Sequence, residues 1–353
     1  MNTKYESIDL AKYIASVFVI VVHVLSGTEI NNFLVFFFVQ GIARLAVPFF
    51  FCCTGYFLAG EGIENGKVVL GFNKKILKLY AMLSLIYIPL ELVKMTFLGT
   101  FHKAGLLGYF QSILVRGTFV HLWYFPAIII ATFSLHFLIT RIPISMVIII
   151  ATCLYLIGLL GDGYYGILHY LPQWIYQSMA VYQDVFLTTR NGIFFGLPFV
   201  LMGVMIAKSS GIPATSKAFP WFLATLLFGG FEIYILSHYE LAVDYNLTLF
   251  LVPGTVLLFL LLLAMPDKLK IHNDYVRLYS TKLYESHMLF YGIILALVTL
   301  YEIPLLENVG IQLLMVWAVS QMFACFAVKR ITRKKRMKNA MERLEGRSYF
   351  MHQ

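Results

Sequence analysis

Long apolar stretches recur along the whole chain and are separated by short polar segments. A transmembrane helix needs about 20 mostly apolar residues, because each helical residue rises about 1.5 Å and the hydrocarbon core is ~30 Å thick. Ten stretches come near this length, at residues 8–27, 34–58, 76–98, 119–139, 143–160, 191–207, 219–238, 245–265, 280–300 and 304–328. The pattern predicts an all-α, polytopic membrane helix bundle with about ten transmembrane helices.

Composition agrees with a membrane protein and excludes a soluble one. Hydrophobic residues make up 60% of the 353 residues and charged residues 13%, against roughly 25% charged in soluble domains. The net charge of +9 comes largely from the C-terminal end, where nine of the 27 Lys and Arg residues lie between Lys329 and Arg347. A basic tail beside a membrane span attracts anionic lipid, so the expected partner is membrane lipid and not nucleic acid.

The four cysteines are Cys52, Cys53, Cys153 and Cys325, and all of them fall inside apolar stretches. We expect them to act as small buried apolar side chains and not as a disulfide or zinc framework. The chain also lacks an H-E-x-x-H motif and a phosphate-cradling glycine loop, so metal-dependent hydrolysis and ATP-driven transport are not expected.

The distribution of basic residues predicts the topology. With a cytoplasmic N-terminus, the segments on that side hold 21 Lys and Arg residues, the opposite loops hold 3, and another 3 lie within spans. A miscounted span would scramble this ratio downstream. We therefore expect both termini in the cytoplasm, an uncleaved first span, residues 1–328 as one transmembrane domain and residues 329–353 as a basic cytoplasmic tail.

The longest external loop is expected at about residues 161–190. It is rich in aromatic residues: Tyr164, Tyr165, Trp174, Tyr176 and Tyr182. Trp and Tyr gather at membrane–water interfaces, so the loop is either an interfacial aromatic belt or a platform on which an acceptor such as a sugar ring stacks. The sequence leaves both interpretations open.

The first span carries an unusual polar stripe. Lys12 and His23 are eleven residues apart, which places them on one helix face about 16 Å apart along the axis, with Asp9 and Ser16 near the same direction. Ionisable groups at membrane depth are costly and often functional. A phosphate held near Lys12 would let a pantetheine-length arm reach His23. The alternative is that Lys12 extends to the interface and His23 makes an interhelical hydrogen bond.

Several short motifs follow one another between residue 8 and about residue 290. They are Lys12-x10-His23; Arg44 with Val47-Pro48-Phe49-Phe50 and Thr54-Gly55-Tyr56; Lys75-x-x-Lys78; His121-Leu122-Trp123-Tyr124-Phe125; and Tyr284-x-x-His287. On these motifs the sequence resembles the acyltransferase 3 family of bacterial membrane proteins, which modify surface glycans and related acceptors. This chain has lysine where the family motifs carry arginine, at Lys12 and at Lys75 and Lys78. Lysine binds phosphate as a point charge, without the bidentate fork of arginine.

The resemblance implies a ten-span bundle with both termini inside, in the bacterial cytoplasmic membrane. It implies transfer of an acyl group, with acetyl favoured, from cytoplasmic acyl-coenzyme A (acyl-CoA) to a cell-surface glycan or small polar acceptor at the outer face. The segment from Arg190 to Pro198 is also similar to the membrane domain of the vancomycin-resistance serine racemases, which is associated with serine supply. The alternative function is therefore a membrane carrier for a small polar metabolite such as serine, without group transfer.

The resemblance and the expected depths assign roles to individual residues. The catalytic residues are expected to be His23, Arg44 and Asp9; the acyl-CoA site Lys12, Lys75, Lys78, Tyr284 and His287; and the acceptor site His121, Trp123 and Glu91. His23 suits a general base or acyl acceptor because its pKa range lies near neutrality. Arg44 is expected either to stabilise an oxyanion or to have a structural role. Glu91 and Lys94 have the i, i+3 spacing of an ion pair, and no metal is expected.

Overall fold

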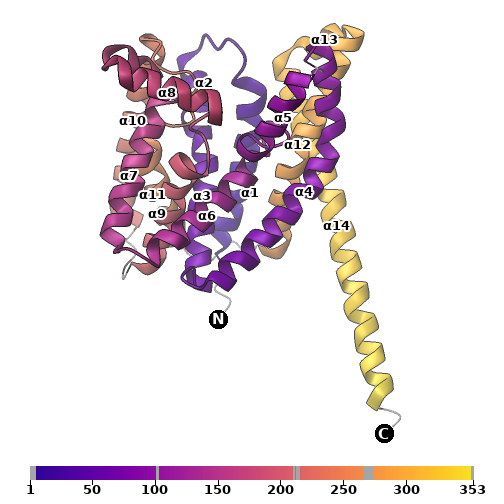
Figure 1. Ribbon diagram of the computed structural model, residues 1–353. Helices are drawn as coiled ribbons and strands as arrows, with labels where there is room; N and C mark the ends of the chain where they lie inside the picture. Colours follow the sequence, from indigo (N-terminus) through magenta and orange to yellow (C-terminus); the bar gives the residue numbers. More distant parts are fainter. Residues whose placement is uncertain (1–4, 101–102, 210, 212–214, 266–272, 351–353) are drawn as a thin grey trace. The chain divides into compact units, whose positions relative to one another are not determined.

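The structure is a computed structural model that describes residues 5–100, 103–209, 211, 215–265 and 273–350. Every regular element among these residues is a helix, which confirms the all-α prediction (Figure 1). Within these residues, six helices or helix runs are long and apolar enough to cross a membrane, and four shorter apolar helices accompany them. Together they match the ten apolar stretches one by one. The chain is a polytopic helical membrane protein.

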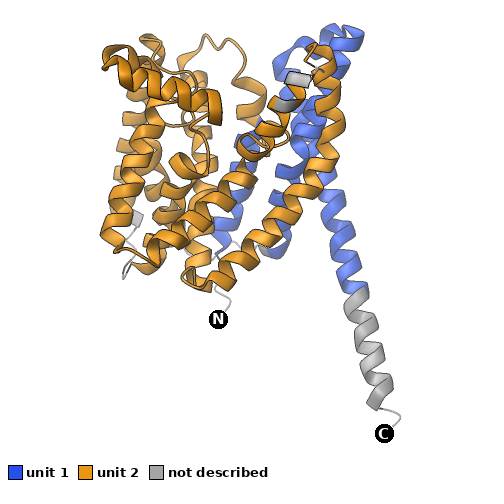
Figure 2. Ribbon diagram, viewed as in Figure 1, with its two compact units in different colours: residues 1–20, 267–353 blue, residues 21–266 orange. Residues whose placement is uncertain are grey.

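The chain divides into two compact units, which are described separately (Figure 2). Unit 1 comprises residues 1–20 and 267–353, and unit 2 comprises residues 21–266. Helix α1 (Glu6–Leu25) runs unbroken across the division after Ile20. Unit 1 also contains α12 (Asn273–Tyr301), α13 (Pro304–Glu307) and α14 (Val309–Phe350).

Unit 2 contains the remaining helices. They are α2 (Phe33–Gln40), η1 (Ile42–Leu45), α3 (Ala46–Glu61), α4 (Gly66–Phe97), α5 (Lys103–Val115), α6 (Tyr124–Ile139), α7 (Ile144–Leu160), η2 (Tyr165–Tyr170), α8 (Gln173–Phe186), η3 (Gly192–Gly196), α9 (Leu197–Lys208), α10 (Thr215–His238) and α11 (Leu251–Ala264). Helix α9 is central, since it packs against α3, α6, α7 and α11 (Figure 1). The turn between α6 and α7 lies at residues 140–143, where Pro143 prevents α6 from continuing as one helix with α7.

The core of unit 2 is tightest where α3 crosses α9. A Cβ atom on Gly55 would lie 1.9 Å from the carbonyl oxygen of Val200, and one on Gly203 would lie 2.0 Å from that of Cys52. Larger residues therefore cannot occupy this crossing, and small residues are what lets transmembrane helices approach closely. Buried aromatic side chains fill the space beside it: Phe51, Phe195 and Phe199.

Polar contacts join the helices of unit 1. The Tyr279 hydroxyl of α12 donates to Gln321 of α14, whose Nε2 donates to the hydroxyl of Tyr13 at 3.0 Å. The Ser16 Oγ of α1 donates to the carbonyl oxygen of Ser280 at 3.2 Å. Interhelical hydrogen bonds of this kind stabilise helix packing where the surroundings are apolar.

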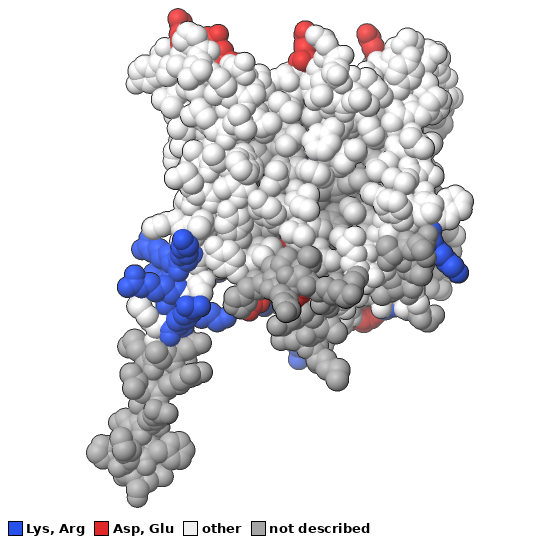
Figure 3. Space-filling model, turned by 180° about the vertical axis from the view of Figure 1, so that it is seen from behind, with Lys and Arg blue, Asp and Glu red and all other residues white. Residues whose placement is uncertain are grey.

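Helix α14 continues past residue 328 to Phe350, so the tail is helical in its described part. The Lys and Arg side chains from Lys329 to Arg336 are exposed and gather where the apolar part of α14 ends (Figure 3). Side chains from residue 338 onward, and Lys4, Lys268 and Lys270 of the cytoplasmic set, lie outside the described residues. The division into a membrane domain and a tail stays a prediction.

Several predicted boundaries differ from the structure. The stretch 34–58 is broken at Gly41 into α2, η1 and α3, and the stretch 245–265 becomes helical only at Leu251. The loop 161–190 contains η2 and α8, and α8 exposes Trp174, Val181 and Val185 on one face, as helices that lie in the membrane interface do. Cys153 is exposed on α7, so the expectation that all four cysteines are buried is wrong.

Candidate functional site

The break at Gly41 places Arg44 on the short 3-10 helix η1. Its Nε and Nη2 donate to Oε1 of Gln40 at 3.2 and 2.7 Å, Nη2 also donates to Oδ1 of Asp244 at 2.7 Å, and Nη1 donates to Oδ1 of Asn246. The guanidinium is buried, and a buried charge is tolerated only when it is paired and hydrogen-bonded. Most of its donors are therefore used within the protein.

Arg190 reaches the same partners from another segment. Its Nη1 donates to Oδ1 of Asn246 at 3.0 Å and lies 4.0 Å from Oδ2 of Asp244. Its guanidinium carbon lies 4.9 Å from the ring centroid of Trp123, where the ring face attracts a cation. We call Gln40, Arg44, Arg190, Asp244 and Asn246 the arginine cluster.

The segment after Arg190 has an unusual backbone. Oδ1 of Asn191 accepts the N–H groups of Ile193 and Phe194 and caps η3, a single π-helical turn that leads into α9. The Asn191 Nδ2 donates to the Tyr182 hydroxyl at 2.7 Å, which ties this turn to α8. Single π-helical turns often occur at functional sites. The cap fixes the segment that carries Arg190.

Asp162, at the end of α7, contacts the cluster through Asn246. Its Oδ1 accepts the N–H groups of Asn246 and Leu247 at 2.8 and 3.0 Å, and its Oδ2 accepts Nδ2 of Asn246 at 3.2 Å. Burial, followed by the negative charge of Asp244, raises the pKa of Asp162 to about 7. Burial also opposes ionisation of Asp244, but the charges of Arg44 and Arg190 outweigh it and lower the pKa of Asp244.

The segment before α6 carries His121 and Trp123. It turns at Gly117, whose φ of 78° lies in the left-handed region that favours glycine. A Cβ atom at this position would also lie 2.6 Å from the backbone nitrogen of Trp123, so glycine is required. His121 is buried and packs edge-on against the ring of Tyr87 at 4.7 Å. Trp123 is buried against aromatic rings of α3 and η3, beneath Arg190.

In unit 1, the buried carboxylate of Asp9 holds two cations. The Lys12 Nζ lies 3.6 Å from Oδ1, and the Arg277 Nε and Nη2 donate to Oδ1 and Oδ2 at 3.3 and 3.1 Å. Arg277 is supplied by the first turns of α12. We call Asp9, Lys12 and Arg277 the Asp9 cluster. A bidentate arginine–carboxylate pair is stronger and more directional than a single contact.

Tyr284 and His287, which were predicted to bind acyl-CoA, lie on α12, the helix that carries Arg277. His287 is fully buried, its Nδ1 donates to the carbonyl oxygen of Tyr284 at 2.8 Å, and the two rings are 5.8 Å apart. One turn away, the Lys282 Nζ donates to Glu285 at 2.6 Å. Tyr284 and His287 therefore contact each other, as their i, i+3 spacing predicts.

The remaining predicted residues differ in their surroundings. Lys75 and Lys78 are exposed on α4, and among the described residues neither has a carboxylate within 4.0 Å. Glu91 pairs with Lys94 at 3.2 Å, which matches the ion-pair alternative. His23 is half-buried near the end of α1, and because α1 is unbroken, helix geometry places it about 16 Å along the axis from Lys12.

The structure brings some predicted site residues together and adds others. Arg44 and Trp123 meet through Arg190, and Asp9 and Lys12 meet through a direct ion pair. Asp9, Lys12, Tyr284 and His287 belong to unit 1, whereas His23, Arg44, Lys75, Lys78, Glu91, His121 and Trp123 belong to unit 2. The residues of these clusters that the sequence did not single out as site residues are Gln40, Asp162, Arg190, Asp244, Asn246 and Arg277. Within the described part of the chain, no group of three or more His, Cys, Asp or Glu side chains is placed to hold a metal ion.

Comparisons with known proteins identify the family. A family model described as an acyltransferase domain matches residues 5–329. A protein named amino-acid racemase from Enterococcus faecalis is 32% identical over 283 residues, which cover 78% of this chain and 39% of that protein. A serine/alanine racemase from Enterococcus gallinarum is 34% identical over 237 residues, which cover 64% of this chain and 32% of that protein.

This chain thus spans about two fifths or less of the length of those relatives. No solved structure matches it significantly. The family model covers nearly the whole chain and extends over most of both units. The chain is a multi-pass membrane protein that belongs to the acyltransferase 3 family.

Proposed function

We propose that this protein transfers an acyl group, with acetyl favoured, from acyl-CoA to a hydroxyl or amine of an acceptor on the other side of the bacterial cytoplasmic membrane. The observation that carries the proposal is the course of α1. One unbroken helix joins Lys12, beside the end predicted to be cytoplasmic, to His23, about 16 Å further along. That separation suits a donor whose phosphates and thioester lie at opposite ends of a pantetheine arm.

In this mechanism, Lys12 holds a phosphate of acyl-CoA as a point charge. Lys75 and Lys78 keep the donor-binding role that the family resemblance gives them. His23 takes the proton of the acceptor hydroxyl while the hydroxyl oxygen attacks the carbonyl carbon of the thioester. The carbon–sulfur bond then breaks, the acyl group stays on the acceptor oxygen, and the coenzyme A thiolate takes the proton from the imidazolium. Every atom and charge is accounted for without a further reactant.

Arg44 receives a positioning role in this proposal. Its guanidinium is buried and already donates to Gln40, Asp244 and Asn246, so it holds the arginine cluster in place. We assign Arg190 of that cluster, together with the neighbouring Trp123, to the acceptor. A cation above an indole ring provides an ionic contact and a flat apolar surface at one point, which suits a sugar or another small polar acceptor.

A second candidate is a carrier for a small amino acid, and the relatives favour it. One of them is named for serine and alanine, and a zwitterion would meet charges of both signs in the arginine cluster. Purified full-length protein mixed with acetyl-labelled acetyl-CoA separates the two functions. The transferase binds coenzyme A or releases it from the thioester, whereas a carrier does neither and instead moves labelled serine into vesicles.

The variant His23→Ala tests the proposed chemistry. It should abolish acetyl transfer per folded molecule while coenzyme A binding survives, since the phosphates lie a full arm's length away. The matched control is His238→Ala, because His238 stacks on Tyr234 near the end of α10 and has no proposed role. Unchanged transfer in His23→Ala would remove His23 from the mechanism.

A further inference from the structure

A surface groove of unit 2 lies between α6, α7 and the start of the η3–α9 segment. Its volume is about 620 Å³. Its lining includes Phe133 and Phe137 of α6, Arg141 of the α6–α7 turn and Leu154 of α7. The lining changes in character along the groove, from mostly apolar side chains in the deeper part to polar ones at the α6–α7 turn.

The apolar part of the groove is on the membrane-facing surface. Phe133 and Phe137 expose large fractions of their rings on α6, as side chains that face hydrocarbon do. On α7 the groove extends to Leu154, which lies ten residues beyond the start of the helix at Ile144, or about 15 Å along its axis. That length is half of the ~30 Å hydrocarbon core. The groove therefore has the length of one acyl chain in a single leaflet.

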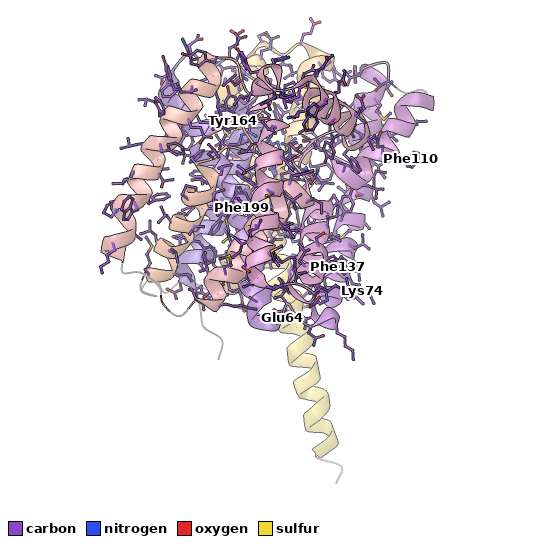
Figure 4. All side chains as sticks on the ribbon, turned by 60° about the vertical axis from the view of Figure 1, so that its left-hand side comes forward. Glu64, Lys74, Phe110, Phe137, Tyr164 and Phe199 are labelled. Atoms are coloured by element: carbon purple, nitrogen blue, oxygen red, sulfur yellow. The ribbon has the colours of Figure 1, made fainter. Side chains whose placement is uncertain are left out.

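The polar end of the groove carries the cation Arg141. Arg141 is exposed in the α6–α7 turn, its guanidinium carbon lies 3.8 Å from the centroid of the Phe137 ring, and among the described residues no carboxylate lies within 4.0 Å of it. Figure 4 shows Phe137 at the same end of unit 2 as Lys74, and Tyr164 toward the opposite end. Arg141 and Lys74 are both on the side predicted to be cytoplasmic.

A second groove on unit 2 provides a comparison. It has a volume of about 290 Å³ between α7, α9 and α11, and none of the described residues that line it is charged. Any lipid chain could lie against such a surface, and nothing there would select a headgroup. The first groove differs because the guanidinium of Arg141 lies at its polar end. A phospholipid whose acyl chain lay in the apolar part of the groove would have its phosphate at that end.

We infer that the groove between α6 and α7 is a binding site for an anionic phospholipid of the cytoplasmic leaflet. One acyl chain lies along Phe133, Phe137 and Leu154, and the headgroup phosphate accepts hydrogen bonds from Arg141. Arginine suits this role because its planar fork matches two phosphate oxygens and is weakly hydrated. A zwitterionic lipid would fit the same groove but gain less from the cation, so charge supplies the selectivity.

Native mass spectrometry of the full chain, extracted from vesicles of phosphatidylcholine and phosphatidylglycerol in equal parts, tests the site. We expect a retained phosphatidylglycerol adduct that falls about fivefold in Arg141→Gln, since one basic residue near the surface contributes about that factor. Arg141→Lys should keep the preference for phosphatidylglycerol. Leu154→Trp, which fills the chain groove and leaves the charge, should lower adducts of both lipids.

The matched control is Lys334→Gln, which removes one exposed cation from α14 and leaves the groove intact. It should change the adduct less than twofold. If Arg141→Gln and Lys334→Gln behave alike, the lipid is held by the general basic surface and the site is wrong. If free glycerol 3-phosphate displaces the adduct as well as an equal concentration of phosphatidylglycerol does, the acyl chain contributes nothing and the groove assignment is also wrong.

Discussion

The arginine cluster of unit 2 and the Asp9 cluster of unit 1 each combine two cations with one carboxylate, but they bury ions of opposite sign. In the arginine cluster the more buried ion is a cation, Arg44, whose side chain is 7% exposed against 40% for its partner Asp244. In the Asp9 cluster the more buried ion is the anion, 2% exposed, and its partners Lys12 and Arg277 are 17% and 55% exposed. Each cluster thus buries one charged side chain and leaves the oppositely charged partners more exposed.

The difference lies in the number of counter-ions. Among the described residues, Asp244 is the only carboxylate within 4.0 Å of Arg44, whereas Asp9 has two cations at that distance. Removing one partner of a buried pair is costly mainly because the other charge stays buried and uncompensated. Arg44 therefore depends on one residue, and Asp9 keeps a counter-ion after either of its partners is lost.

The largest effect is expected for Asp244→Ala. It leaves Arg44 buried without a counter-ion, so the free energy of unfolding should fall by about 3 kcal/mol, the lower end for a broken buried pair because Asp244 is partly exposed. Denaturant unfolding in detergent micelles measures the loss. The matched control is Asp184→Ala, an exposed aspartate of α8, which should change stability by less than about 0.5 kcal/mol. Equal results for the two variants would contradict the dependence of Arg44 on Asp244.

A double-mutant cycle tests whether the two cations of the Asp9 cluster substitute for each other. Lys12→Gln and Arg277→Gln should each lower the free energy of unfolding by about 1 kcal/mol or less, because both cations are at least partly hydrated. Together they should lower it by about 3 kcal/mol, since the buried Asp9 then has no counter-ion. The same unfolding measurement gives an interaction free energy of about 1 kcal/mol. Simple additivity would show that the second cation does not compensate for the first.

Asp162 adds a pH dependence to the arginine cluster. Its raised pKa means that the folded protein binds this proton more tightly than the unfolded chain does, so the stabilisation is complete below pH of about 4 and is lost as the pH rises toward 7. We expect the free energy of unfolding to fall across that window by on the order of 3 kcal/mol. Asp162→Asn should flatten the profile relative to the wild type.

Asp244→Asn serves as the control for this dependence, because the charge of Asp244 helps to raise the pKa of Asp162. In Asp244→Asn, the pH range over which the free energy of unfolding falls should move to lower pH, but the free energy should still depend on pH. Thermal unfolding midpoints recorded at matched ionic strength from pH 4 to 8 measure both variants. A profile in Asp162→Asn that follows the wild type would show that another group causes the pH dependence.

The positions of the apolar helices could be predicted from the sequence because the length and polarity of a span are local properties of the chain. Each apolar stretch has the length that a bilayer requires, and each corresponds to an apolar helix. The exceptions are informative. The stretch 34–58 breaks at Gly41, beside Arg44, and the stretch 245–265 begins with a non-helical segment that carries Asn246. An apolar average does not reveal a break that a few polar side chains stabilise.

The clusters were harder to predict because their contacts join distant parts of the chain. Arg44 stands out in the sequence as a charge at membrane depth, but its partner Asp244 lies 200 residues away in a short loop. Asp9 and Lys12 are neighbours on one helix and could be paired from their spacing. Arg277 lies 268 residues from Asp9 and had no signal beyond its charge. Spacing predicts contacts within a helix and gives no information about which helices meet.

The smallest effect is expected for Glu91, which has the same i, i+3 spacing to Lys94 as Asp9 has to Lys12. The spacing is equal, but Lys94 is 55% exposed near the end of α4 and the pair is not enclosed by the protein, so Glu91→Gln should lower the free energy of unfolding by less than about 0.5 kcal/mol. Asp9→Asn should cost more, because its carboxylate is buried between two cations. If Glu91 instead binds the acceptor, Glu91→Gln will lower acetyl transfer per folded molecule at unchanged stability, through a higher KM for the acceptor and not for acetyl-CoA. Measuring transfer and unfolding on the same preparation therefore distinguishes an exposed ion pair from an acceptor contact at this position.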